Sequence, residues 1–347
     1  MCGIFGYIGT KECAKFLYGG LCRLEYRGYD SAGIATIHGN ALSCEKVVGR
    51  VQNLKSKLPA LPGIVGIAHT RWATHGEPTL ANAHPHLDEN SSVAIVHNGI
   101  IENHAFLRQM LKKEGHVFSS QTDSEVLAHL IEEECKAHDS LLEAVRHALS
   151  RVEGAFGLVV LHKDFPDELI VAKRGSPLVI GILDGARMVA SDPSALIEHT
   201  RDVVYLQDDQ IARLTKDDHE LFSLDDGQHS DHEVCSVQWD VQQLEKGGFD
   251  HFMLKEIDEQ PVAIRDSLAG RLKKLIETGS LSGLNLTDVC AKACRRIIII
   301  ACGTSWHAGL VAKHFFTRFS RVPVEVAYAS EFRYDEPILG KDDIVIA

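Results

Sequence analysis

The first two residues, Met1 and Cys2, can supply a nucleophile together with its own base. If the initiator methionine is removed, which a small second residue permits, Cys2 carries a thiol and a free α-amino group on the same carbon. An α-amine titrates at about pH 8, low enough to take the thiol proton and later return it to a leaving amine. On its own this signal is weak, because most cysteines at the second position have no catalytic role.

Asn98 and Gly99 follow an apolar stretch that is typical of a strand. The dipeptide Asn-Gly most often forms a type I′ turn between two strands. The alternative is an oxyanion hole, in which a side-chain amide and a backbone N–H point at one oxygen. Each such donor stabilises a tetrahedral transition state by about 3 kcal/mol. The residues alone leave both interpretations open.

Arg71 and Asp123 are opposite charges at the ends of predicted elements. They are compatible with a salt bridge or with solvated charges, and Thr122 or Asp123 can cap the helix that follows. They are also compatible with a clamp on a free amino acid. In that case Arg71 grips the α-carboxylate through two hydrogen bonds and Asp123 takes the α-ammonium group, which leaves the side-chain amide facing Cys2.

Two further patterns concern ligands. A tetrapeptide between a buried strand and a helix has the form of an anion site, in which small residues and hydroxyls meet a phosphate or a sugar, although such turns also occur without ligands; it consists of Cys302, Gly303, Thr304 and Ser305. Several histidines in the first third of the chain suggest a metal, but they form neither a helical i, i+4 pair nor an H-E-x-x-H motif; they are His69, His75, His84, His86 and His97. We expect no metal and no cofactor.

Length and composition restrict the class of protein. A chain of 347 residues favours two domains, and its net charge of −12 argues against a nucleic-acid partner. The sequence has neither a signal peptide pattern nor an apolar run of about 18 residues, so we expect a cytoplasmic protein without membrane contact. The nine cysteines are scattered and contain no C-x-x-C pair, which is typical of reduced thiols.

The hydrophobic pattern divides the chain in two. Residues 2–240 contain helices and apolar strands that suit stacked sheets with helices outside, although 207–240 is polar and reads as irregular apart from a strand at 236–239. Charge and paired glycines indicate a linker at 241–250. Residues 251–347 have the pattern of alternating strands and helices that is typical of βαβ units, with four consecutive isoleucines in a strand predicted to be buried on both faces. This sheet stops inside its third strand, so we expect a truncated domain.

Five motifs together resemble the N-terminal-nucleophile (class II) glutamine amidotransferases, and within them the bacterial glutamine–fructose-6-phosphate aminotransferases: MCGIFG at 1–6, EYRGYDSAG at 25–33, HTRWATHG at 69–76, HNGIIEN at 97–103 and QTDSE at 121–125. Residues 255–261, 301–305 and 329–334 resemble the start of the sugar-isomerase (SIS) half of that family. The resemblance covers essentially the whole chain. It implies a four-layer αββα domain over 2–240, followed by an incomplete doubly wound α/β SIS-type domain over 251–347.

The resemblance also implies roles for particular residues. Cys2 attacks the carboxamide of glutamine while Asn98 and Gly99 stabilise the oxyanion. Arg71 and Asp123 hold the charged ends of glutamine. Further residues of the glutamine site and of the ammonia path are Trp72, Thr74 and His75, while Arg27 lies in a family motif without a certain role.

The family's second domain implies a sugar substrate. Ammonia from glutamine would reach fructose 6-phosphate there and give glucosamine 6-phosphate. Because the second phosphate loop and the isomerase acid/base residues are not in the sequence, we expect this chain to hydrolyse glutamine at best. The full-length form is expected to be a homodimer. The alternatives are another class II amidotransferase, such as the purine-pathway phosphoribosyl enzyme or asparagine synthetase, or a non-catalytic sugar-phosphate-binding protein.

Overall fold

The computed structural model describes residues 2–72, 76–237, 248–268 and 292–347. Its internal contacts divide the chain into two compact units, Met1–Gly248 and Phe249–Ala347, which are described separately below. Met1, Thr74 and His75, which are named in the sequence analysis, lie outside the described residues, and so do 238–239 of the predicted strand and 241–247 of the predicted linker. Within the described parts, every helix is too short or too polar to span a bilayer.

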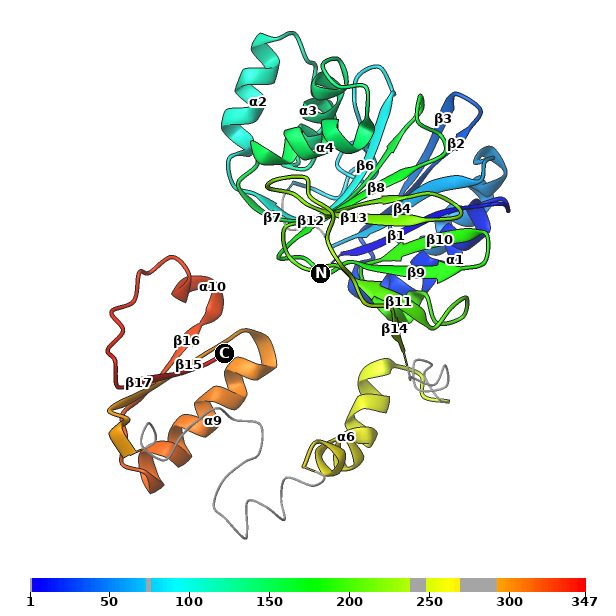
Figure 1. Cartoon of the computed structure of the whole chain (residues 1–347). Coiled ribbons are helices and arrows are strands. Elements are labelled where there is room, and N and C mark those ends of the chain that lie inside the picture. Colours follow the sequence, from blue (N-terminus) through cyan, green and yellow to red (C-terminus); the bar gives the residue numbers. More distant parts are fainter. Residues whose placement is uncertain (1, 73–75, 238–247, 269–291) are drawn as a thin grey trace. The chain divides into compact units, whose positions relative to one another are not determined.

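Two antiparallel sheets form the centre of the first unit (Figure 1). The first sheet has the spatial order β14 (Cys235–Ser236), β11 (Asp202–Tyr205), β9 (Val179–Leu183), β10 (Ala186–Ala190), β1 (Gly3–Gly9), β4 (Val65–Arg71), β2 (Ser31–His38) and β3 (Ala41–Val48). The second has the order β13 (His219–Ser223), β12 (Gln210–Leu214), β8 (Leu169–Arg174), β7 (Gly154–His162), β6 (Val93–Ile101) and β5 (His86–Leu87).

Strand β1 shows how the sequence builds the layers. Successive side chains of a strand point to opposite faces of its sheet. Ile4 and Ile8 therefore join the core between the two sheets, whereas Phe5 and Tyr7 face the other way and pack with helix α1 (Ala14–Leu24). The helix approaches closely because Gly20 has no side chain, and a Cβ there would lie 2.4 Å from the Phe5 ring.

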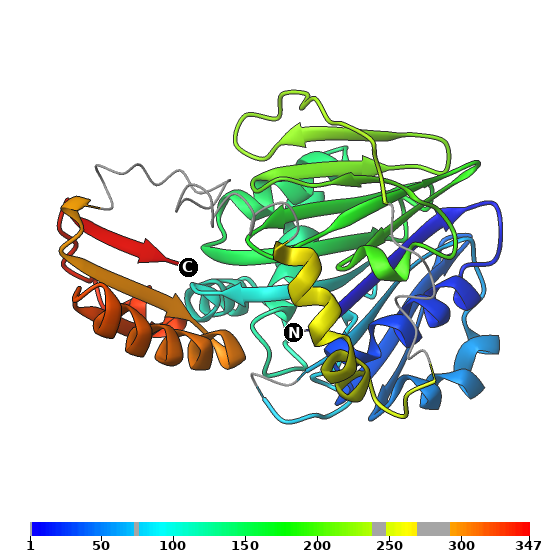
Figure 2. The ribbon, with the colours of Figure 1, turned by 90° about the horizontal axis from the view of Figure 1, so that it is seen from below.

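Helices cover the outer faces of both sheets (Figures 1 and 2). Helix α1 and the 3-10 helix η2 (Val51–Ala60) share a buried apolar cluster with the first sheet. Helices α2 (His104–Lys113), α3 (Glu125–Cys135) and α4 (Leu141–Ser150) share another with the second sheet. A third cluster fills the space between the sheets. The layers therefore run helix, sheet, sheet, helix, which confirms the predicted αββα architecture.

One sequence prediction in this unit was wrong. Residues 207–240, expected to be largely irregular, contain β12 and β13, which pair in register from Gln210↔Ser223 to Leu214↔His219. β13 carries polar side chains because it is the edge of its sheet, whereas β12 lies between β13 and β8 and buries Ile211, Ala212 and Leu214. Of the two interpretations left open for Asn98 and Gly99, the type I′ turn is excluded, since both residues lie within β6 and pair with β7.

The second unit contains helix α6 (Phe252–Leu268) and a parallel sheet in the order β16 (Val324–Tyr328), β15 (Arg296–Ala301) and β17 (Asp343–Ile346). Helix α9 (Gly303–Phe319) connects β15 to β16 and packs on both, and the short α10 (Ala329–Phe332) follows. Of the four isoleucines, residues 297–299 are buried. The predicted parallel βαβ arrangement is confirmed.

Candidate active site

At one end of the space between the two sheets, polar residues replace apolar ones. Strand periodicity explains why: residue 2 lies on the same face as Ile4, His69 and Arg71 continue the inward face of β4, and Asn98 continues that of β6. The described residues lining a cavity of about 40 Å³ at this end are Cys2, Arg71, Trp72, His84, His97, Asn98, Gly99, Thr122, Asp123 and Ser124.

Cys2 lies half-buried immediately before β1. Its Sγ accepts a hydrogen bond from the backbone N–H of Trp72 at 3.2 Å. The chain beyond it is fixed because the N–H of Gly3 donates to Thr70 Oγ1 at 3.2 Å. A side chain at residue 3 would collide with Thr70 and Leu24, so glycine is required for the terminus to lie against β4.

Burial raises the pKa of the Cys2 thiol, although the Trp72 amide, the chain terminus, Arg71 and Arg27 act in the opposite direction. The resting thiol therefore keeps its proton at neutral pH. Attack by this sulfur requires a base to remove that proton.

The two predicted oxyanion donors are adjacent on β6. Asn98 Nδ2 donates to the carbonyl oxygen of Cys2 at 3.0 Å, and Asn98 Oδ1 lies 3.0 Å from His69 Nε2. Gly99 has φ of +135°, and a Cβ there would lie 1.9 Å from the carbonyl oxygen of Ala155. Only glycine fits this backbone, which explains the Asn-Gly dipeptide without a turn.

The predicted amino-acid clamp is brought to the same cavity. Arg71 is buried at the end of β4, and its Nη1 and Nη2 each donate at 3.4 Å to backbone carbonyls, those of Glu77 and Gly76. Burial lowers the pKa of Arg71, while Cys2, Asp30 and Asp123 oppose that shift, and a guanidinium stays charged at neutral pH.

Asp123 does not cap helix α3. The N-cap residue is Ser124, and no side chain makes the capping hydrogen bond. Asp123 Oδ2 instead accepts the buried N–H of Ile101 at 2.8 Å, and Ser124 Oγ lies 3.5 Å from Oδ1. This bond across to β6 holds the carboxylate beside the cavity.

The remaining predicted residues occupy different positions. The Trp72 side chain is 43% exposed and packs edge-to-face on Tyr29, with 5.4 Å between ring centroids. Arg27 is buried and forms an ion pair with Asp192 at 3.1 Å, and its Nη1 also donates to the carbonyl of Ser191.

Four of the histidines considered as metal ligands are buried around the site. His69 and His84 stack with ring centroids 4.1 Å apart, and His84 contacts His86 edge-on. His97 Nδ1 lies 2.8 Å from Ser124 Oγ. Burial lowers the pKa of all four, that of His69 to about 3. These rings are therefore neutral packing and hydrogen-bonding groups at physiological pH.

Two groups that sequence analysis did not identify bring three possible metal ligands within 4.8 Å of one another: Glu134, His138 and His147, and Glu114, His116 and Glu133. Both belong to the region of helices α2–α4. In the second group His116 Nε2 already pairs with Glu133 at 2.6 Å.

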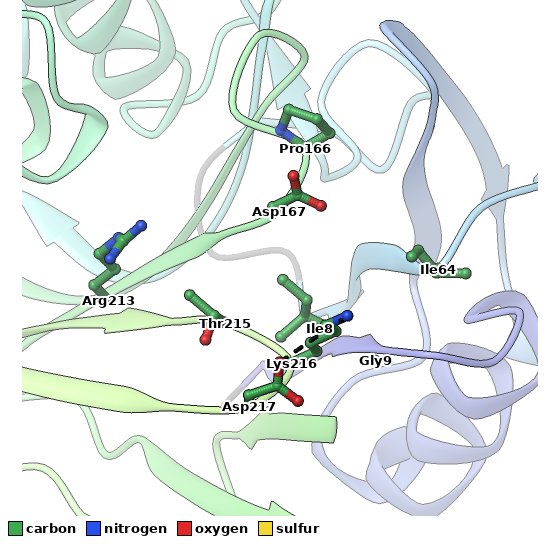
Figure 3. A pocket seen from close by; sticks show the side chains of 9 residues that line it. All are labelled: Ile8, Gly9, Ile64, Pro166, Asp167, Arg213, Thr215, Lys216 and Asp217. Carbon is green, nitrogen blue, oxygen red and sulfur yellow. Dashed lines mark ion pairs between the residues drawn. The ribbon is translucent and has the colours of Figure 1, made fainter. Parts of the chain in front are cut away.

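A larger cavity of about 290 Å³ lies at the far end of β1 from Cys2, beside Ile8 and Gly9 (Figure 3). Its cations are ion-paired: Arg213 contacts Glu168 and Glu220, and Lys216 lies 4.0 Å from Asp217. The described residues that line it include no thiol and no imidazole. The smaller cavity, by contrast, is lined by Cys2 and by the imidazoles of His84 and His97.

The predicted sugar-phosphate residues 302–305 lie in the second unit, where Cys302 follows β15 and 303–305 begin α9, and all four are exposed. Cys302 is the N-cap residue of α9, and Gly303 has φ of +59°. The first backbone N–H groups of this 17-residue helix follow directly.

Two stacked antiparallel sheets between helices, with a cysteine at the open end of a central strand, are the architecture of the N-terminal-nucleophile glutamine amidotransferases. The profile of the family described as "Glutamine amidotransferase domain" matches residues 69–198, and that of the SIS domain matches 292–347. Among solved structures, the allosteric regulatory enzyme of purine biosynthesis is 29% identical with a TM-score of 0.57, over 65% of this chain and 49% of that one. The glutamine phosphoribosylpyrophosphate amidotransferase from B. subtilis has a TM-score of 0.58 at 22% identity, over 94% of this chain and 65% of that one, and shows the fold alone.

Curated relatives match over the entire chain. Glutamine–fructose-6-phosphate aminotransferase [isomerizing] of Chlorobaculum tepidum is 49% identical, and that of Clostridium tetani is 46% identical. Over its entire length the chain is similar to this family of glutamine–fructose-6-phosphate aminotransferases. The aligned region covers all of this chain but 57% of the length of each of these relatives.

Proposed function

We propose that the first unit hydrolyses glutamine to glutamate and ammonia, with Cys2 as the nucleophile once Met1 has been removed. The observation that carries this proposal is the shared cavity of Cys2, Arg71 and Asp123. Glutamine has the complementary groups: a carboxylate for Arg71, an ammonium for Asp123 and a carboxamide for the thiol. A free amino acid needs more room than about 40 Å³, so we expect side chains to shift when it binds.

The raised pKa of the thiol defines what the base must do. The free α-amine of Cys2 takes the thiol proton, and sulfur forms a bond to the carboxamide carbon. Negative charge then develops on the carboxamide oxygen, where Asn98 Nδ2 and the Gly99 N–H donate hydrogen bonds. The C–N bond breaks as the α-amine returns the proton to nitrogen, and ammonia leaves. Water then cleaves the thioester to glutamate and free thiol.

Other residues have proposed roles around this reaction. Trp72 holds the sulfur through its backbone N–H at 3.2 Å and, with its half-exposed side chain, controls the path by which ammonia leaves. Thr74 and His75, outside the described residues, contact glutamine beside Arg71.

We further propose that in the full-length protein, a homodimer, the ammonia is transferred to fructose 6-phosphate and yields glucosamine 6-phosphate. Residues Cys302, Gly303, Thr304 and Ser305 would form one part of the sugar-phosphate site. Their support is the exposed N-terminus of α9, whose backbone N–H groups suit a phosphate. Because this chain spans 57% of its relatives, we expect it to have glutaminase activity without amino-sugar synthesis.

The test is the glutaminase activity of the purified chain, with Cys2→Ala as the control and intact mass to establish the loss of Met1. We expect ammonia release by the wild-type chain well above the Cys2→Ala background. Equal rates in preparations that have lost Met1 would overturn the proposal. A preparation that retains Met1 lacks the free α-amine and must first be processed with an aminopeptidase.

A further inference from the structure

The Asn98 carboxamide lies between two partners that determine its orientation. The carbonyl oxygen of Cys2, 3.0 Å away, can only accept a hydrogen bond, so the amide nitrogen must face it. The amide oxygen then faces His69 Nε2 at 3.0 Å. An oxygen in this position needs a donor, and His69 supplies it only if Nε2 carries the proton.

His69 has little freedom to do otherwise. Its side chain is 1% exposed, and its buried Nδ1 makes no well-formed hydrogen bond within the described residues, although the backbone of His97 also acts on the ring. The ring stacks on His84, with 4.1 Å between centroids. Because burial holds the pKa of His69 at about 3, the ring is neutral and has one N–H. The Asn98 contact places that hydrogen on Nε2.

We propose that His69 is a positioning residue that locks the Asn98 carboxamide with its N–H groups toward the sulfur and the developing oxyanion. The inference rests on the glutaminase function proposed above and adds a residue to it. The terminal torsion of asparagine is broad and nearly two-fold, so its orientation depends on two hydrogen bonds, the one to the Cys2 carbonyl and the one from His69. A flipped amide would present its oxygen to the oxyanion and repel the charge it must stabilise.

Four variants separate positioning from structural support. His69→Phe keeps the ring volume and removes the donor. His69→Gln places an amide N–H where Nε2–H was. Asn98→Ala removes the group on which His69 is proposed to act. His162→Phe is the matched control, since His162 is a buried histidine at the opposite end of β7 from the residues that pair with Asn98 and Gly99.

The readouts are kcat and KM for glutamine, with the melting temperature of each variant. Removing one oxyanion donor lowers kcat about 100- to 1000-fold. We expect His69→Phe to lower kcat at least tenfold relative to wild type. Its KM for glutamine should stay within about twofold of the wild-type value. His69→Gln should recover most of the loss. In an Asn98→Ala background His69→Phe should have no further effect on kcat, because the two residues act as one unit. His162→Phe should leave kcat unchanged.

Either a wild-type kcat in His69→Phe or an additive loss in the double variant would overturn the inference. Neither result would affect the glutaminase proposal as long as the wild-type chain is active. A wild-type chain without activity would refute the glutaminase proposal instead. The tautomer can be read without turnover by ¹⁵N NMR of the histidine rings. We expect His69 to be protonated on Nε2 and bare on Nδ1, and the reverse pattern would also overturn the inference.

Discussion

Replacing Asp123 with asparagine tests the amino-acid clamp with little change of shape. The carboxylate accepts the Ile101 N–H through Oδ2 at 2.8 Å. In Asp123→Asn the amide oxygen must take over that bond, because the amide NH₂ cannot accept it. The NH₂ group then occupies the Oδ1 position and presents a donor to the substrate ammonium. The attraction between the carboxylate and the substrate ammonium is therefore lost, and the amide N–H donors face the N–H donors of the ammonium.

The magnitude follows from the bond that is removed. A hydrogen bond between charged groups contributes about 1.5–3 kcal/mol, and Asp123 is buried enough for little solvent screening. At about 1.4 kcal/mol per tenfold, kcat/KM for glutamine should fall roughly 10- to 150-fold. Most of the fall should be in KM, since the ammonium group is distant from the reacting carbon.

Glutaramic acid, which is glutamine without its α-amino group, provides the internal comparison. The wild-type chain should prefer glutamine over glutaramic acid by the same factor that Asp123→Asn loses, and the variant should show almost no preference. The matched control is Asp88→Asn, another buried carboxylate that accepts backbone N–H groups, from Ser92 and Val93. It should keep the preference. An equal fall for both substrates in Asp123→Asn would refute the clamp.

Three further predictions concern the same end of the molecule. Gly99→Ala should destabilise the chain and abolish glutaminase activity, because its Cβ would lie 1.9 Å from Ala155 O at a φ of +135°; an active variant with an unchanged melting temperature would contradict this. Arg71→Lys should lower kcat/KM about tenfold or more by losing the paired donors of the guanidinium, and a wild-type KM would contradict it. Stability should fall below about pH 6.5, because the unfolded histidine binds a proton there while folded His69, with a pKa of about 3, does not; this costs about 1.4 kcal/mol at pH 5.5. Buried His84 adds a loss of the same sign, and urea midpoints that do not change between pH 7 and 5.5 would count against the effect.

Much of the site could be predicted from strand periodicity. Cys2 shares a face with Ile4, and Arg71 lies two residues after His69 on a strand whose inward residues are apolar. The same alternation places His69 on the inward face of β4, together with Arg71.

Other features depend on pairing that local sequence does not encode. Asn98 and Gly99 favour a turn by themselves, yet pairing with Gly157 and Phe156 holds them in an extended strand. Asp123 precedes a helix and is a residue type that often caps one, but its carboxylate instead accepts a hydrogen bond from the backbone N–H of Ile101. The edge strand β13 is polar and the short strand β12 lacks a clear apolar alternation, so neither could be recognised without the strand it pairs with.

The central claim is that Cys2, as a free N-terminal residue, attacks a bound glutamine. The most direct measurement is peptide mass spectrometry after reaction with a glutamine analogue that has a diazoketone in place of the carboxamide. We expect a single adduct on a Cys2 that has lost Met1, formed with loss of N₂ and prevented by excess glutamine. An unlabelled Cys2 in fully processed protein, or a label on another cysteine that glutamine does not prevent, would contradict the account.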